Sequence, residues 1–93
     1  MRHALRVDAN QAQIISALQA AGAIVEIIGQ PVDLLVGYKG RFMLVEVKDG
    51  GKVKSAQKTT AVQDKFFAKF EGYPHALVNS PESALRALRV LAS

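Results

Sequence analysis

The stretch that decides the fold is residues 31–48, which read PVDLLVGYKGRFMLVEVK. Its β-branched and aliphatic residues predict two strands, Val32–Tyr38 and Arg41–Asp49. The tripeptide Tyr38-Lys39-Gly40 has the length of a hairpin connection, so the two strands should lie side by side. The sequence also predicts helices and further strands before and after this hairpin.

Helices are expected on both sides of the hairpin. Asn10 and Gln13 have the spacing of a capping box, which predicts a helix from Asn10 to Ala21 that Gly22 ends. After the hairpin, Ser55 can cap a helix that runs to Glu71. An apolar stripe at helical spacing along this second helix should belong to the core; its members are Val62, Phe66 and Phe70. The dipeptide Ser80-Pro81 begins the last helix.

Two further strands, Ala23–Ile28 and His75–Asn79, complete an αβββαβα order. This order predicts an α/β fold with a mixed central sheet and flanking helices. A chain of 93 residues, 49% hydrophobic and 22% charged, has the composition of a globular protein. We therefore expect residues 1–93 to form one domain, since a second core would not fit.

The composition also predicts a cytoplasmic protein that forms a homodimer. The chain has no Cys, which fits a reducing compartment. Charged residues near the start argue against a signal peptide, and polar residues in the most apolar stretch, 14–36, argue against a membrane-spanning helix. A small domain with this apolar content favours a second copy as partner. The first candidate for the interface is the final helix, with Leu85, Leu88, Val90 and Leu91, and the first helix is the second candidate.

The net charge of +4 comes from the second half of the chain. Lys52, Lys54 and Lys58 form a tight cluster, which Lys65 and Lys69 continue at helical spacing. A polarised basic surface of this kind is typical of contact with phosphate backbones. The alternative is a solvated lysine face on an exposed helix.

Two carboxylates and one amine can meet on the hairpin. The period of two along the second strand puts Glu46 and Lys48 on the same face. Asp33 can lie opposite them, because neighbouring strands are about 4.8 Å apart. Carboxylate oxygens suit Mg²⁺ or Mn²⁺, and a lysine beside such an ion implies hydrolysis of a phosphodiester. The alternative is that Glu46 and Lys48 belong to an ordinary solvent-facing strand and that Asp33 is a turn residue.

Pro31-Val32-Asp33, a hairpin and then Glu46-Val47-Lys48 form a constellation that resembles the PD-(D/E)XK nuclease superfamily. The chain looks most like the small stand-alone VRR-NUC type domains of bacteriophages and bacteria, over roughly residues 10–91. The resemblance implies a restriction-endonuclease-like core, in which Asp33, Glu46 and the Val47 carbonyl bind Mg²⁺ (or Mn²⁺) and Lys48 is the catalytic lysine. Ser55-Ala56-Gln57 is similar to the start of the next helix in the family, which implies that Gln57 supports the metal-site water or the phosphate.

The function that this resemblance implies is metal-dependent DNA endonuclease activity on branched DNA such as a Holliday junction, in a bacterial or phage-infected cytoplasm. Lys52, Lys54 and Lys58 would contact the DNA. Two features depart from the family: the Val-Arg-Arg signature is missing, and the first helix has no carboxylate where members often have Glu. Asp8, just before that helix, is a candidate substitute. The alternative function is a non-catalytic nucleic-acid-binding or scaffolding protein with the same fold.

Overall fold

The computed structural model describes residues 9–49 and 59–93. These residues form an α/β fold with a four-stranded mixed sheet and three helices, so the expected class and element order are confirmed. Within the described ranges, no helix combines the length and the apolar character needed to cross a membrane. The elements are α1 (Ala9–Ala20), β1 (Ile24–Ile27), β2 (Leu34–Tyr38), β3 (Arg41–Val47), α2 (Ala61–Lys69), β4 (His75–Val78) and α3 (Pro81–Ala92).

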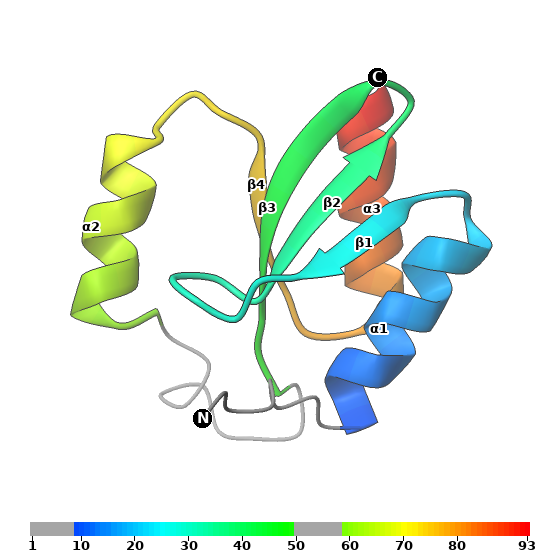
Figure 1. Cartoon of the computed structure of the whole chain (residues 1–93), viewed down its shortest axis with the longest axis horizontal. Coiled ribbons are helices and arrows are strands. Elements are labelled where there is room, and N and C mark those ends of the chain that lie inside the picture. The colour runs from blue at the N-terminus through cyan, green and yellow to red at the C-terminus, as the bar shows by residue number, and fades with distance from the viewer. Residues whose placement is uncertain (1–8, 50–58) are drawn as a thin grey trace, which may run out of the picture.

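The strands lie in the sheet in chain order, β1-β2-β3-β4 (Figure 1). The first three form an antiparallel meander, in which Leu34 of β2 pairs with Val45 of β3. β4 runs parallel to β3, with Val47 paired to Val78, and the Lys48 amide extends the ladder by donating to the Val78 carbonyl. The carboxyl ends of β3 and β4 therefore meet at one edge of the sheet.

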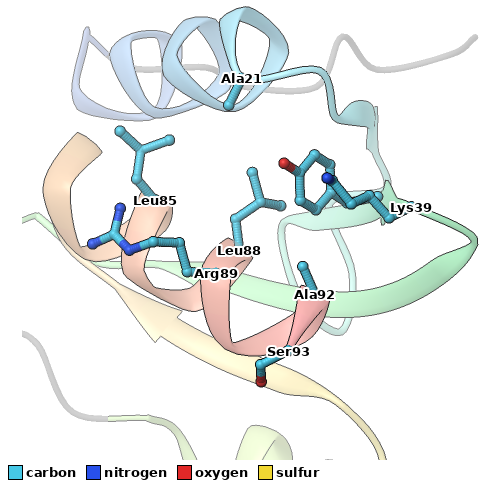
Figure 2. Close-up of a pocket in the computed structure, with 8 residues that line it drawn as sticks. Ala21, Lys39, Leu85, Leu88, Arg89, Ala92 and Ser93 are labelled. Atoms are coloured by element: carbon cyan, nitrogen blue, oxygen red, sulfur yellow. The ribbon is translucent and has the colours of Figure 1, made fainter.

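The β2–β3 connection is a two-residue turn formed by Lys39 and Gly40. Both residues have positive φ values, 51° and 78°. Two positive φ angles match the right-handed twist of the flanking strands, which explains why Gly occupies the second position. The Lys39 ammonium lies 5.5 Å from the centre of the Tyr38 ring, and the turn lies beside α3 (Figure 2). The hairpin expected at this place is confirmed.

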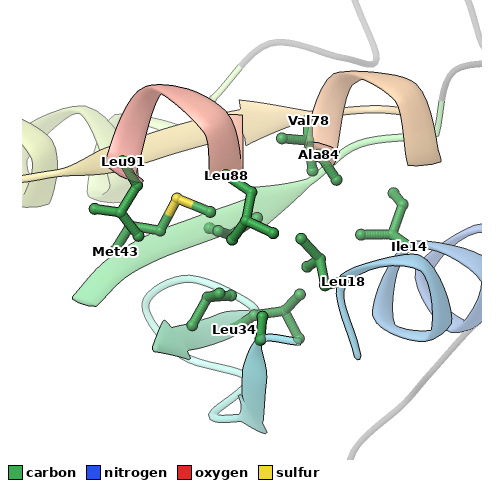
Figure 3. Packing of buried hydrophobic residues seen from close by; sticks show 11 residues of the cluster. Ile14, Leu18, Leu34, Met43, Val78, Ala84, Leu88 and Leu91 are labelled. Carbon is green, nitrogen blue, oxygen red and sulfur yellow. The ribbon is translucent and has the colours of Figure 1, made fainter. Parts of the chain in front are cut away.

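One face of the sheet carries the hydrophobic core. α1 and α3 pack against this face, while their apolar side chains meet those of the strands (Figure 3). Side chains along β3 alternate between the two faces of the sheet, as the period of two predicts. Met43 and Val45 point into the core, and Leu44 and Glu46 point to the opposite face. The core cluster comprises Ile14, Leu18, Ala23, Leu34, Val36, Met43, Val45, Val78, Ala84, Leu88 and Leu91.

Most apolar residues of the final helix pack in this core, and Val90 is the exposed exception. Leu88 and Leu91 are buried, and Leu85 packs against the cluster. Arg41 fastens the end of the helix by donating to the carbonyls of Leu91 and Ser93, at 2.9 and 2.8 Å. The expectation that Leu88 and Leu91 supply a dimer interface is therefore wrong, because the chain's own sheet already covers them.

Asn10 lies within α1 (Ala9–Ala20) and is not its cap. The Asn10 side-chain amide instead donates to the backbone carbonyls of Lys48 and Asn79, at 2.8 and 3.2 Å. These carbonyls come directly after β3 and β4. Asn10 thus ties α1 to the edge of the sheet where the two parallel strands end, a long-range role that the capping-box spacing does not indicate.

The second helix differs most from its prediction. Thr59 and Thr60 are not helical, and a capping box between Thr60 and Gln63 starts α2 at Ala61. The helix buries none of its residues, and Figure 1 shows it apart from the α1 and α3 layer. The expected core stripe is wrong: Val62 is 69% exposed, and the two phenylalanines of the stripe are only half-buried.

Aromatic contacts hold α2 next to β4. The rings of Phe66 and Phe70 lie 4.8 Å apart, and Phe70 meets Tyr73 edge-on at 5.9 Å. Phe67 stacks on His75 at 4.7 Å, with an interplanar angle of 27°. His75 and the core residue Val78 are three positions apart on β4, and an odd separation puts their side chains on opposite faces of the sheet. α2 therefore lies on the face of the sheet that α1 and α3 leave uncovered.

Candidate active site

Glu46 and Lys48 lie at the end of β3 on the uncovered face of the sheet. Glu46 is only 6% exposed, although neither α1 nor α3 covers its face of the sheet. The Lys48 ammonium is 3.3 Å from a carboxylate oxygen of Glu46. This salt bridge is largely removed from solvent, because the two side chains are 13% and 8% exposed. A charged pair held this far out of water is costly unless further groups satisfy it.

Asp33 joins this pair from the residue before β2. Its carboxylate accepts a hydrogen bond from the Val47 amide at 2.8 Å. Its backbone carbonyl accepts from the amides of Ile28 and Gly29, at 2.9 and 3.1 Å, which closes the β1–β2 connection. Leu34 is paired with Val45, so one step further along the same antiparallel register places Asp33 opposite Glu46, as expected. The structure therefore brings together the three side chains that the sequence predicts.

Electrostatics make Asp33 the unusual member of the three. Its pKa is raised from the ordinary value of 3.8 to about 6, first because burial disfavours the carboxylate. The hydrogen bond from the Val47 amide lowers the pKa. The charge of Glu46 and a hydrogen bond between the two carboxyl groups raise it again, and the Lys48 charge lowers it. The carboxyl groups of Asp33 and Glu46 thus lie close together in a partly buried site, where the Lys48 ammonium is the neighbouring positive charge.

Gln63 is a site residue that the sequence analysis did not single out. It lies in the first turn of α2, where its side-chain oxygen is 3.5 Å from the Lys48 ammonium. Its side-chain amide donates to the Pro31 carbonyl at 3.2 Å, so it also touches the segment that leads to Asp33. The signal for it is Thr60-Ala-Val-Gln63, which has capping-box spacing. The family resemblance instead implies this kind of role for Gln57, in Ser55-Ala56-Gln57.

The comparisons with known proteins add nothing to this geometry. No protein-family model, no curated protein and no solved structure matches the chain. The assignment of a function therefore depends on the residues of the site and their arrangement.

The donor set fits a divalent cation of the Mg²⁺ type. Two carboxylates in contact, one of them with a raised pKa, provide hard oxygen ligands whose mutual repulsion a cation would relieve. Within the described residues no three His, Cys, Asp or Glu side chains cluster, so waters and the substrate would complete the coordination. The structure brings the Val47 amide to Asp33, while the Val47 carbonyl as a ligand stays a prediction.

Several predicted residues lie outside the described part of the chain. These are Asp8, the candidate third carboxylate, with Ser55, Gln57 and the basic cluster Lys52, Lys54 and Lys58. Their proposed roles stay predictions. Lys65 and Lys69, which continue the basic cluster in the sequence, are exposed on α2. The described site therefore consists of Asp33, Glu46, Lys48 and Gln63.

Proposed function

We propose that the protein is a metal-dependent DNA endonuclease with a restriction-endonuclease-like core. The observation that carries this proposal is the convergence of Asp33, Glu46 and Lys48 at one partly buried edge of the sheet. The order of these residues along the chain, with their hairpin, resembles the PD-(D/E)XK nucleases. A structural role alone offers no reason to press two carboxylates together, since like charges in a desolvated place destabilise the fold.

Each residue of the site has a separate task in phosphodiester hydrolysis. Asp33 and Glu46 would hold Mg²⁺, and the Val47 carbonyl is the third protein ligand that we propose. The bound ion supplies a lowered pKa for its water and a Lewis acid for the phosphate. The Lys48 ammonium orients the attacking water and offsets the negative charge that develops on the phosphate oxygens. As the water oxygen bonds to phosphorus, the bond between phosphorus and one sugar oxygen breaks, and the proton that the water loses ends on that sugar oxygen.

Two groups keep this arrangement in place. The Val47 amide holds one oxygen of Asp33, which leaves the other oxygen for the cation. The Gln63 oxygen faces the Lys48 ammonium and restricts its position between α2 and β3. Gln63 is thus a positioning residue in this proposal, because it acts through Lys48.

The second candidate function is nucleic-acid binding without turnover. The observation that favours it is the first helix, whose sequence ANQAQIISALQA contains no carboxylate. A cleavage assay separates the two candidates: the protein is incubated with Mg²⁺ and labelled linear, flap and four-way DNA, and parallel samples contain EDTA. We expect cleavage that requires Mg²⁺ and is fastest on branched DNA. Binding of DNA without any cleavage would favour the second candidate.

A homodimer belongs to the proposal, because cutting two strands calls for two sites and twofold symmetry supplies them most simply. The uncovered sheet face supports it, since Ile24, Phe42 and Leu77 are 76%, 67% and 51% exposed there. Light scattering at micromolar concentration should return the mass of two chains. A monomer mass at every accessible concentration would remove the paired-cut arrangement while leaving single-strand cleavage open to the assay above.

A further inference from the structure

A pocket lies at the sheet edge where β3 and β4 end. Its volume is about 260 Å³, and its lining residues are Lys48, Leu77, Val78, Asn79, Ser83 and Arg86. Asn79 follows β4, while Ser83 and Arg86 belong to the first two turns of α3. The crevice outside the carboxyl ends of parallel strands is where open α/β sheets bind ligands. Pockets that enclose whole small molecules have volumes of about 300–1,000 Å³. This pocket is smaller, so it fits one group of a larger ligand.

The charge of the lining selects an anion. Two of the six lining residues are basic and none is acidic. Arg86 is exposed, and no ion pair within residues 9–49 and 59–93 joins it to a carboxylate. A guanidinium without a protein partner can present its planar fork to two oxygens of a phosphate. The pocket rim is fixed, because the Ser83 hydroxyl accepts hydrogen bonds from the amides of Asn79 and Ser80, each at 3.0 Å.

Lys48 connects this pocket to the carboxylates. Its ammonium pairs with Glu46, and the same residue lines the pocket. A group bound beside Arg86 therefore lies next to the place where the phosphodiester would be cleaved. We propose that this pocket binds a neighbouring backbone phosphate of the DNA, with Arg86 as its main ligand. The proposal rests on the proposed nuclease function and assigns the path of one DNA strand across the sheet edge.

The test compares two arginines on the same helix. Arg89 lies three residues after Arg86, is exposed, and lines a different pocket of about 280 Å³ at the far end of β2 (Figure 2). Arg86→Gln and Arg89→Gln remove the same charge from the same element. Their affinity for a fluorescent four-way junction is measured by anisotropy over a series of salt concentrations, with Ca²⁺ in place of Mg²⁺. Melting curves of both variants establish that the fold is unchanged, and Arg86→Met, which removes the same charge, serves if Arg86→Gln does not fold.

We expect Arg86→Gln to raise the Kd about 10-fold, the size of a lost charge-assisted hydrogen bond. The slope of log affinity against log salt should fall by about 0.9, which corresponds to one phosphate contact. Arg89→Gln should change the Kd less than about twofold. Equal losses of affinity in both variants, or no loss in Arg86→Gln, would overturn the phosphate pocket. Mg²⁺-dependent cleavage by the wild type would in that case still support the nuclease. A wild type that binds DNA with this Arg86 dependence and never cleaves it would uphold the pocket and overturn the nuclease. A wild type that binds no DNA overturns both.

Discussion

Helices α2 and α3 begin in the same way and end in opposite environments. Each has a Ser or Thr cap that is closed by a reciprocal bond with the residue three positions on. α3 then buries Ala84, Leu88 and Leu91, whereas α2 buries no residue. A cap determines where a helix starts, but only the surface that faces it determines whether the helix joins the core. The α3 side of the sheet thus carries stability, and the α2 side carries the candidate chemistry.

The largest expected effect tests the α2 side of the sheet, where replacing the buried Glu46 should affect activity and not stability. Glu46→Gln keeps the shape of the side chain but removes one ligand charge, so cleavage should fall by at least about 10³-fold. Stability should change little, because the relieved repulsion with Asp33 and the lost salt bridge to the Lys48 ammonium have opposite effects. Glu26→Gln is the matched control, since Glu26 is an exposed carboxylate on β1. Cleavage of labelled DNA and chemical denaturation are measured on both variants, and a wild-type rate in Glu46→Gln would sink the metal site.

The opposite pattern is expected on α3. Leu88→Ala opens a cavity in the core and should cost about 2–5 kcal/mol of unfolding free energy. Val90, two residues later, is 74% exposed, so Val90→Ala should change stability by less than about 0.5 kcal/mol. Urea denaturation followed by circular dichroism gives both values. Similar losses in the two variants would mean that α3 does not pack on the sheet through the Leu88 face.

Stability and cleavage should depend on pH in opposite directions, because both involve the Asp33 carboxyl. The pKa of Asp33 is about 6 in the folded protein, compared with 3.8 ordinarily. Between pH 3.8 and about 6, the Asp33 carboxyl is therefore protonated in the folded state and ionised in the unfolded state. Stability from this group is therefore present below about pH 4 and is lost as the pH rises through 6. Metal binding needs the carboxylate, so cleavage should rise through the same range, about tenfold per pH unit below 6.

Denaturation without metal and initial cleavage rates, both from pH 4 to 8, test these two trends. In Glu46→Gln the pKa of Asp33 should move down, because the neighbouring charge that raises it is gone. Carboxyl carbon shifts in NMR spectra report this directly. An Asp33 that titrates near 4 in the wild type would contradict the crowding of the two acids.

The smallest effect concerns Gln63, which has one role in the cap of α2 and another beside Lys48. Gln63→Ala should lower cleavage about 10-fold by loosening the lysine, and it should also cost about 1 kcal/mol of stability. Thr60→Ala breaks the same cap without touching Lys48, so it should cost similar stability and leave cleavage within about twofold. Measuring rates across pH adds a readout that a purely structural role would not move. Equal rates in the two variants would reduce Gln63 to a capping residue.

The parts of this fold that could be predicted from the sequence depend on neighbours in the chain. The turn at Lys39-Gly40, the cap at Ser80 and the alternation along β3 each follow from a few consecutive residues. The meeting of Asp33 with Glu46 and Lys48 also follows, because a two-residue hairpin fixes the register of its strands.

The errors all concern partners that are distant in sequence. Asn10 has the spacing of a cap but bonds to carbonyls 38 and 69 residues away. Phe66 has the spacing of a core residue, yet α2 lies on the side of the sheet away from α1 and α3. Leu88 was expected at an interface because periodicity shows which residues of a helix are apolar, not which surface covers them.

The chain order of the sheet has a consequence for how the protein folds. β1, β2 and β3 pair with their neighbours through short connections, whereas β4 must return from a crossover between residues 48 and 74 to lie parallel to β3. Closing a long loop costs more entropy than closing a short one, so the meander should form before β4 docks. The place where Lys48 meets Gln63 would then be among the last parts of the molecule to assemble.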